Sequence, residues 1–392
     1  MISVTKLLLG REYSGDRLRY RRGTNSAGAA DGLGPVVVWN CTRACNLLCR
    51  HCYASATPYA CDAELSTGEA KDFLDTLAAF NVPALLLSGG EPLLRRDLFE
   101  LLEYARTLGL RTALSTNGTL IDERTAARIM ELGVSYAGIS LDGSRSVNDA
   151  FRGVDGAYDR TISGFRNCRK AGQKAGLRLS MTRSTLKELP EIFRLVEDEG
   201  IARVCLYHLV PSGRGAELTD EEPSPEKKRA ALDFLAEKTL DFAARGVETE
   251  ILTVDNHCDG IYLYLREKER GGNRAAEMLE LLTASGGNRS GVAIGAVDWE
   301  GDVHIDQFTQ EIILGNVRER DFPEIWRGET DSFLHRLRDR KRHLRGRCRT
   351  CGWLEQCNGN LRARALAAGD FWGPDPSCYL TGDEIASGGA TC

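Results

Sequence analysis

The sequence lacks the features that mark membrane, secreted and nucleic-acid-binding proteins. None of the apolar runs in its 392 residues approaches the roughly 20 residues needed to span a bilayer. The first residues, MISVTKLLLGREYSGDRLRYRRG, hold too short an apolar run for a signal peptide and no small-residue cleavage site, so we expect a cytoplasmic location. With a net charge of −5 there is no basic excess to hold phosphate backbones. We therefore expect neither a nucleic-acid partner nor a membrane span.

Evidence for a disulfide framework is lacking as well. The chain has 13 cysteines, an odd number in the absence of an export signal, which favours thiolate ligands in a reducing compartment. They crowd towards the two ends and leave a cysteine-poor middle. The early group is Cys41, Cys45, Cys49, Cys52 and Cys61, and the late group is Cys348, Cys351, Cys357, Cys378 and Cys392.

Short apolar runs recur from residue 36 onwards, each with the length of a buried strand. They are Val36–Trp39, Ala84–Ser88, Arg111–Thr116, Tyr136–Leu141, Leu177–Thr182 and Arg203–Val210. Helical patterns lie between them, and the first opens with a capping box at Ser66–Glu69. This alternation predicts an α/β fold, a parallel sheet curving into a partial (β/α)6 barrel, with the chemistry at the carboxyl ends of the strands.

Composition divides the chain into four parts. Residues 1–34 are rich in Arg and Gly and predict a loosely attached arm. Residues 35–215 form the barrel, and residues 216–290, charged helices without strand–helix alternation, predict a helical linker or insert. Residues 291–392 form a cysteine-rich extension that begins with β-like alternation around a turn.

Three thiols follow the first predicted strand in the stretch CNLLCRHC, at Cys45, Cys49 and Cys52. Three thiolates suit a [4Fe–4S] cluster whose fourth iron stays open to a small molecule, whereas four would close it. The alternative is a zinc site completed by His51 or Cys41, because zinc prefers four nitrogen or sulfur ligands.

The CxxxCxxC motif, the sequence GGEP at Gly89–Pro92 and the six-strand pattern together resemble the radical S-adenosylmethionine (radical SAM) superfamily. The resemblance implies that the three cysteines hold a [4Fe–4S] cluster whose open iron binds SAM, and that an electron from the cluster yields a 5′-deoxyadenosyl radical. It assigns SAM contacts to residues after the strands, where a turn-forming or capping role is the alternative. They are Gly90 and Glu91 for the methionine ammonium, and Ser115, Asn117, Ser140 and Asp142 for ribose and carboxylate. Arg178, inside the fifth strand, is also expected to bind the cofactor, because it would be an unusual core residue unless its charge met a carboxylate.

Four thiols near the end have the spacing C-x2-C-x5-C-x20-C, at Cys348, Cys351, Cys357 and Cys378. Four thiolates close a site, and the pattern resembles the SPASM/Twitch extension, which carries auxiliary clusters. His304 and Asp306 stand where many such extensions have a further cysteine, so we expect one auxiliary [4Fe–4S] cluster. Zinc is again the alternative, and Cys61 and Cys392 are expected to be free thiols.

Longer stretches, among them YHLVPSGRG, LTVDNHCDGIYLYL and PSCYLTGDEI, resemble the haem-biosynthesis branch of the superfamily. This implies an iron tetrapyrrole substrate, removal of acetate side chains from didecarboxysirohaem to give iron coproporphyrin, and an electron donor such as flavodoxin or ferredoxin. The alternatives are propionate removal in d1-type haem synthesis and a SPASM peptide maturase, although the 34-residue arm is too short for the peptide-binding domain of such maturases. An electron carrier is a further alternative, but a carrier needs no open iron.

An anionic iron tetrapyrrole requires groups for its carboxylates and its metal. Arginine forks pair with carboxylates, and imidazole or thiolate ligates iron. The arginines in predicted rim loops are Arg43, Arg50, Arg152, Arg214 and Arg289. Candidate axial ligands are His208, His257, His304 and Cys258, for each of which a structural role is the alternative.

Overall fold

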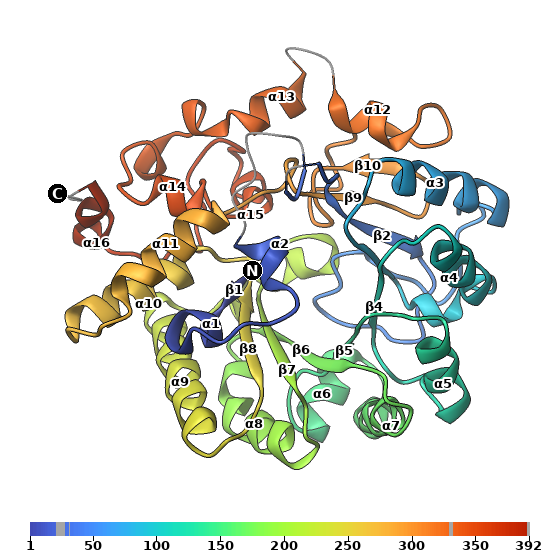
Figure 1. Ribbon diagram of the computed structural model, residues 1–392, viewed down its shortest axis with the longest axis horizontal. Coiled ribbons are helices and arrows are strands. Elements are labelled where there is room, and N and C mark those ends of the chain that lie inside the picture. The colour runs from blue at the N-terminus through green and yellow to red at the C-terminus, as the bar shows by residue number, and fades with distance from the viewer. Residues whose placement is uncertain (21–27, 31, 329–331, 390–392) are drawn as a thin grey trace.

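The computed structural model describes residues 1–20, 28–30, 32–328 and 332–389. In this part of the chain one sheet of 11 strands runs through the molecule, and helices lie around its outside (Figure 1). The strand order is β1-β8-β7-β6-β5-β4-β3-β2-β9-β10-β11. None of the described helices combines the length and apolarity needed to cross a bilayer.

The middle of the sheet is parallel and follows the chain order. Its strands are β2 (Val36–Thr42), β3 (Leu85–Gly89), β4 (Thr112–Thr116), β5 (Ala137–Ser140), β6 (Ala175–Met181) and β7 (Arg203–His208). They coincide with the six apolar runs, so the predicted fold class is confirmed. Because helices cover the outer face, most of these strand residues are buried.

Helices connect these strands and hold them in the parallel direction. They are α3 (Thr67–Ala79), α4 (Leu98–Thr107), α5 (Glu123–Glu131), α6 (Arg145–Arg152), α7 (Ala157–Lys170) and α8 (Leu189–Asp198). The predicted capping box is present, because the Ser66 hydroxyl accepts from the Glu69 amide and the Glu69 carboxylate accepts from the Ser66 amide.

Residues 216–290 contain a strand, which the sequence interpretation missed. After α9 (Pro225–Ala244), β8 (Glu250–Val254) pairs in parallel with β7, and α10 (Cys258–Glu269) and α11 (Ala275–Ser285) follow. The expectation of a linker without strand–helix alternation is therefore wrong for this segment. The run ILTV is short and flanked by polar residues, yet all five residues of β8 are buried.

The start of the chain is docked rather than loosely attached, which corrects a second expectation. Here β1 (Ile2–Ser3) pairs antiparallel with β8, and α1 (Val4–Leu9) and α2 (Asp16–Arg19) follow. Ile2, Val4 and Leu7 are at most 1% exposed. Burial of these three apolar side chains holds the start of the chain in place despite its Arg- and Gly-rich composition. Residues 21–27 and 31 of the expected arm lie outside the described residues.

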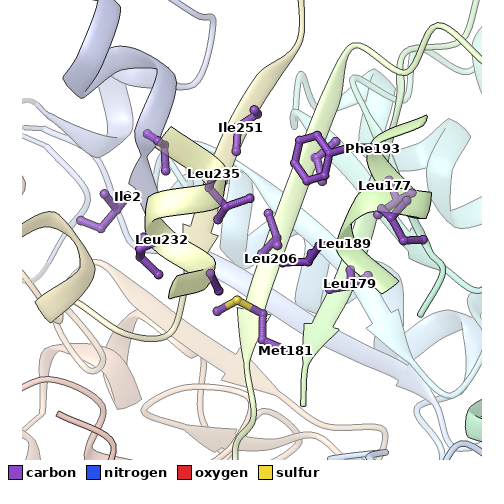
Figure 2. Close-up of a cluster of buried hydrophobic side chains, with 14 of the residues drawn as sticks. Ile2, Leu177, Leu179, Met181, Leu189, Phe193, Leu206, Leu232, Leu235 and Ile251 are labelled. Carbon is purple, nitrogen blue, oxygen red and sulfur yellow. The ribbon is translucent and has the colours of Figure 1, made fainter. Parts of the chain in front are cut away.

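A continuous apolar core joins the strands to the helices and to the start of the chain. Figure 2 shows side chains from β6, β7, α8, α9, β8 and β1 meeting in one cluster. The labelled residues are Ile2, Leu177, Leu179, Met181, Leu189, Phe193, Leu206, Leu232, Leu235 and Ile251. Full burial of each such side chain contributes about 1.5–3 kcal/mol, so the start of the chain and β8 stabilise the barrel together.

The C-terminal extension continues the same sheet. β9 (Ile294–Val297) pairs in parallel with β2 and antiparallel with β10 (Asp302–His304), which confirms the predicted hairpin. The rest consists of β11 (Gly315–Asn316), α12 (Phe322–Arg327), α13 (Phe333–Arg338), α14 (Leu354–Cys357), α15 (Arg362–Ala367) and α16 (Gly382–Ala386).

A buried ion pair fastens this extension to the barrel. Arg364 and Asp375 are each 2% exposed, and Nε of Arg364 lies 2.9 Å from Oδ1 of Asp375. The same guanidinium donates to the carbonyls of Leu209, just after β7, and Asp255, just after β8. One side chain therefore holds three segments of the chain together.

Replacing Arg364 with Met should strongly destabilise the protein. The change leaves Asp375 as a buried, uncompensated charge, which costs about 3–5 kcal/mol. Urea unfolding of the anaerobically purified protein measures this loss. Arg194→Met is the matched control, because Arg194 is 71% exposed in its pair with Glu191, and its effect should stay within about 0.5 kcal/mol. Equal losses in the two variants would contradict the role given to Arg364.

Candidate functional site

The three cysteines after β2 lie together in a small apolar cluster with Leu47 and Ala56. Each sulfur has at least one N–H donor. The Leu47 amide is 3.4 Å from the Cys45 sulfur, the Ala56 amide is 3.4 Å from the Cys52 sulfur, and Nη1 of Arg152 is 3.5 Å from the Cys49 sulfur. Such donors stabilise thiolates that ligate iron. The donor set and its hydrogen bonds thus fit the expected cluster.

Burial disfavours ionisation of two of these thiols, those of Cys45 and Cys49. It raises the pKa of Cys45 to about 12. It also raises the pKa of Cys49, although the neighbouring Arg152 opposes the shift. A bound cation reverses this preference, because coordination deprotonates a thiol.

The zinc alternative gains no support from the residues proposed to complete it. Cys41 lies in a different part of the core and donates to the Ser88 carbonyl, while the His51 ring stacks on Phe151 at 4.5 Å. In the described part of the chain, no three His, Cys, Asp or Glu side chains are close enough together to hold a single metal ion.

Two glycines of the GGEP motif let the cysteine loop approach the end of β3. Gly89 has φ +120°, a conformation that side chains disfavour. A Cβ on Gly90 would lie 2.1 Å from the Ala44 carbonyl oxygen, next to Cys45. The Gly90 amide donates to Thr42 and the Glu91 amide donates to Ala44. The motif is therefore required by the backbone of the cysteine loop.

Glu91 is fully buried and joins β3 to the end of β4. Its carboxylate accepts from the Thr116 hydroxyl at 2.7 Å, the Asn117 amide at 2.8 Å and the Leu93 amide at 3.2 Å. Burial outweighs these hydrogen bonds and raises the pKa of Glu91 to about 7. Asn117 in turn is held by Asn46, with its Nδ2 4.0 Å from the Cys45 sulfur. Glu91 and Asn117 together connect the cysteine loop to β3 and β4.

A cavity of about 130 Å³ opens at the carboxyl ends of the strands. Every strand from β2 to β7 contributes to its wall, and so do residues after β8 and β10. Its polar lining includes His51, Ser115, Ser140, Arg152, Arg178 and Asp255. The cavity therefore contains Ser115, Ser140 and Arg178 of the predicted SAM contacts, whereas Glu91, Asn117 and Asp142 are not among its lining residues.

Arg152 connects the cavity wall to the cysteine loop. It forms an ion pair with Asp142, which is fully buried and accepts from the Ser180 amide at 2.7 Å, and it also contacts Cys49. A substrate carboxylate, the partner predicted for Arg152, would therefore have to compete with Asp142 for the guanidinium. Asp142 is placed to orient Arg152.

Among the described residues, Arg178 meets no carboxylate, contrary to the condition set from the sequence. Its guanidinium donates to the Ser115 hydroxyl and lies 4.6 Å from the centre of the Tyr207 ring. A cation–π contact of this kind is strongest when it is shielded from water. Arg178 therefore brings a positive charge to the cavity wall.

The other predicted rim arginines lie away from the cavity, and two of them bond backbone carbonyls. Arg214 donates to the carbonyls of Cys49 and Ala56 and so fixes the cysteine loop. Arg289 donates to the carbonyls of Gly28 and Ala29. Arg43 lies 5.5 Å from the Trp299 ring, and Arg50 is exposed. None of these four is among the described residues that line the cavity.

The candidate iron ligands lie in different places. His208 lines the cavity, and its Nε2 is 2.8 Å from Asp259. His257 is buried outside the cavity lining, with its amide bound to Asn360. His304 is held by the Ile312 carbonyl and Asp298, a structural role.

Cys258 lies next to the auxiliary cysteines rather than at the cavity. Its thiol donates to Asn256 at 3.0 Å, and burial together with the neighbouring Cys378 raises its pKa. This position does not support its predicted role as a ligand to substrate iron.

The four late cysteines surround one small pocket. Cys348, Cys351, Cys357 and Cys378 line it together with the apolar side chains Ile261, Leu354, Leu380 and Ile385. Neither His nor Asp nor Glu is among the described residues of this lining, so the donor set is thiolate only and fits an iron–sulfur cluster. Cys61 is a free thiol, as expected, and donates to Glu300 at 3.6 Å, whereas Cys392 lies outside the described residues.

The sequence interpretation missed two cavity residues, His51 and Asp255. Burial lowers the pKa of His51 to about 4, so a neutral aromatic ring lies beside the cysteine loop. Burial raises the pKa of Asp255 to about 6. The position of His51 inside the CxxxCxxC motif was a usable signal, whereas Asp255 depended on recognising β8.

Replacing Arg152 with Gln should shift the reduction potential of the expected cluster to more negative values. The change removes a positive charge and an N–H donor from the Cys49 sulfur, both of which favour the reduced cluster. Redox titration followed by electron paramagnetic resonance measures the shift. Arg160→Gln is a control, because Arg160 is exposed on α7. An unchanged potential in a protein with full iron content would contradict the role of Arg152.

Replacing Glu91 with Gln should reduce the pH dependence of stability. The pKa of Glu91 is higher in the folded than in the unfolded state. The folded protein therefore loses stability as the pH rises from about 4.5 to about 7. Between pH 5 and 8 the wild type should lose about 3 kcal/mol more than the variant, as measured by urea unfolding at each pH. Glu103→Gln, on the exposed side of α4, should follow the wild type. Parallel curves for all three proteins would refute the assignment.

Comparison with known proteins agrees with this geometry. The model of the radical SAM superfamily matches residues 39–196, and that of the SPASM iron–sulfur cluster-binding domain matches residues 293–352. Fe-coproporphyrin III synthase of Methanosarcina barkeri is 47% identical over 98% of this chain and 99% of that protein. Pre-heme d1 synthase of Dinoroseobacter shibae is 44% identical over 90% of this chain and 88% of that protein.

A solved structure supports the fold. Streptococcus suis SuiB, bound to its precursor peptide SuiA, superposes with a TM-score of 0.69 over 89% of this chain and 76% of that chain, at 18% identity. This likeness shows the fold, and the two relatives above show the family. The chain belongs to the radical SAM superfamily, in the branch of these haem-biosynthesis enzymes, and its cofactors are a SAM-binding [4Fe–4S] cluster and an auxiliary iron–sulfur cluster.

Proposed function

We propose that this enzyme removes the acetate side chains of didecarboxysirohaem and forms Fe-coproporphyrin III. The observation that carries the proposal is the 47% identity to Fe-coproporphyrin III synthase along essentially the whole length of both chains. The site agrees with it, because the buried Cys45 and Cys49 and the partly buried Cys52, each with an N–H donor, lie beside a cavity lined by both polar and apolar groups.

The residues of this chain prepare the site in three ways. Arg152 and the amides of Leu47 and Ala56 stabilise the thiolates of the cysteine triad. Gly90 and Glu91 fix the loop that presents them. When cluster and SAM are bound, they supply a 5′-deoxyadenosyl radical that can take a hydrogen atom from the substrate.

The far side of the cavity suits an anionic substrate that must be shielded from water. Arg178 provides a positive charge that carries no counter-carboxylate among its described partners, and a substrate carboxylate would supply one. Phe308 and Val210 line the same cavity, and the Ser212 hydroxyl bonds the Phe308 carbonyl at 2.8 Å. That contact draws the loops after β7 and β10 together over the site.

Formation of pre-heme d1 is the second candidate, because the synthase of that compound is 44% identical to this chain. We favour acetate removal, since the match to Fe-coproporphyrin III synthase covers both ends of the chain. A peptide maturase finds less support, because the likeness to SuiB at 18% identity concerns the fold alone.

We further propose that one auxiliary [4Fe–4S] cluster on the four late cysteines passes electrons between the site and a donor such as a ferredoxin or flavodoxin. Four protein thiols around one pocket support this role, since a fully ligated cluster has no open iron for a substrate. A small cytoplasmic electron-transfer protein as donor agrees with the cytoplasmic location expected from the sequence.

Anaerobic incubation of the reduced enzyme with SAM and didecarboxysirohaem should release acetate and yield Fe-coproporphyrin III. Mass spectrometry of the macrocycle and quantification of 5′-deoxyadenosine measure the two products. Cys49→Ala should abolish both, because it removes one of three cluster ligands. Cys61→Ala should retain both, because Cys61 lies outside the two thiol sets.

Other products identify the alternatives. Propionate loss with gain of oxo groups would establish the pre-heme d1 type of reaction instead. An unchanged macrocycle despite formation of 5′-deoxyadenosine would rule out this tetrapyrrole as substrate.

A further inference from the structure

Three buried side chains form a hydrogen-bonded chain from the cavity to the C-terminal extension. His208, at the carboxyl end of β7, lines the cavity, and its Nε2 lies 2.8 Å from Oδ2 of Asp259. Oδ1 of Asp259 accepts from the Tyr379 hydroxyl at 2.8 Å. The side chains of His208 and Asp259 are 2% and 0% exposed, so water does not compete for these bonds.

The partners of Asp259 determine which nitrogen of His208 carries the proton. Oδ1 of Asp259 accepts from the Tyr379 hydroxyl, and Oδ2 faces Nε2 of His208. A carboxylate can only accept hydrogen bonds, so Nε2 is the ring nitrogen that donates to it. Nδ1 is then the ring nitrogen left to ligate a metal.

This arrangement is the one that metal-binding histidines adopt. A ligating imidazole donates its second N–H to a carboxylate, which fixes the ring and raises its basicity. Neutral imidazole is a good ligand for iron and holds the iron of haem as an axial ligand. In His208 the supporting carboxylate is already in place and is itself fixed by Tyr379.

His208 borders the same cavity as the cysteine loop, because His51 of that loop is also among the lining residues. The segment after β7 contacts the loop directly, since Arg214 donates to the Cys49 carbonyl. A ligand held by His208 would therefore lie within the space that the cysteine loop faces. His257 and Cys258 are not among the described residues of the cavity wall.

We propose that Nδ1 of His208 is the axial ligand to the iron of the tetrapyrrole substrate and that Asp259 and Tyr379 are positioning residues. The assignment rests on the proposed function and deepens it, because it makes the metal part of what the enzyme recognises. Ligation would hold the substrate iron at the carboxyl end of β7. The enzyme should then distinguish iron tetrapyrroles from the same macrocycles without metal.

The test compares binding of Fe-coproporphyrin III and metal-free coproporphyrin III to the anaerobic holoenzyme. Difference absorbance in the Soret region and electron paramagnetic resonance report on the iron ligand. We expect the wild type to shift the iron spectrum and to bind the iron form at least tenfold more tightly. His208→Asn should abolish both effects but bind the metal-free form like the wild type, and added imidazole should restore the shift in His208→Gly.

Two further variants separate ligation from a structural effect. Asp259→Asn keeps the imidazole but removes its acceptor carboxylate, so the shift should weaken while iron–sulfur content stays full. His257→Asn, a change at a buried histidine outside the cavity lining, should behave as the wild type.

The outcomes distinguish this assignment from the proposed function. If the wild type converts didecarboxysirohaem but His208→Asn keeps the spectral shift and the preference for iron, the ligand assignment is wrong and the function stands. A loss of turnover in His208→Asn with an unchanged iron spectrum also overturns it, in favour of proton transfer. If the wild type converts no didecarboxysirohaem, the function fails and the assignment fails with it.

Discussion

The close approach of the backbone at Gly90 to the carbonyl of Ala44 is the contact on which the site depends. A single Cβ at Gly90 would come within 2.1 Å of that oxygen. Because the approach is allowed, the amides of Gly90 and Glu91 bond the residues just before Cys45, and the Glu91 carboxylate reaches the end of β4. The cysteine loop, which has no regular secondary structure of its own, thereby gains the rigidity of two strands.

Two buried carboxylates near the cavity are each paired with a nitrogen group that lies closer to the cavity. Asp142 is held by Arg152, which also contacts a thiol of the cluster, and Asp259 is held by His208, which faces the substrate space. In each pair the carboxylate lies deeper and the nitrogen group faces the chemistry. The cost of burying an unpaired carboxylate keeps the nitrogen group in place. The same constraint gives Arg152 and His208 fixed orientations before any ligand binds.

Local patterns in the sequence were sufficient for the six central strands, the capping box at Ser66 and the two thiol sets. Each of these is specified by neighbouring residues, as a short apolar run, a cap or a fixed spacing. The strand at Glu250–Val254 and the docked start of the chain depend on pairing between residues 2–3 and 252–253, which local patterns do not encode. The partners of Arg152, Arg178 and Asp259 likewise come from distant segments. Side-chain roles at the cavity could therefore be named as candidates but not assigned.

The two outermost strands of the sheet, β1 and β11, are only two residues long. Exposed sheet edges recruit other polypeptides by strand addition, and very short edges suppress this. The molecule therefore offers almost no template for β-augmentation. A partner protein would instead have to recognise side chains on the outer helices, and its docking would respond to salt and to surface charge rather than to the backbone of the sheet.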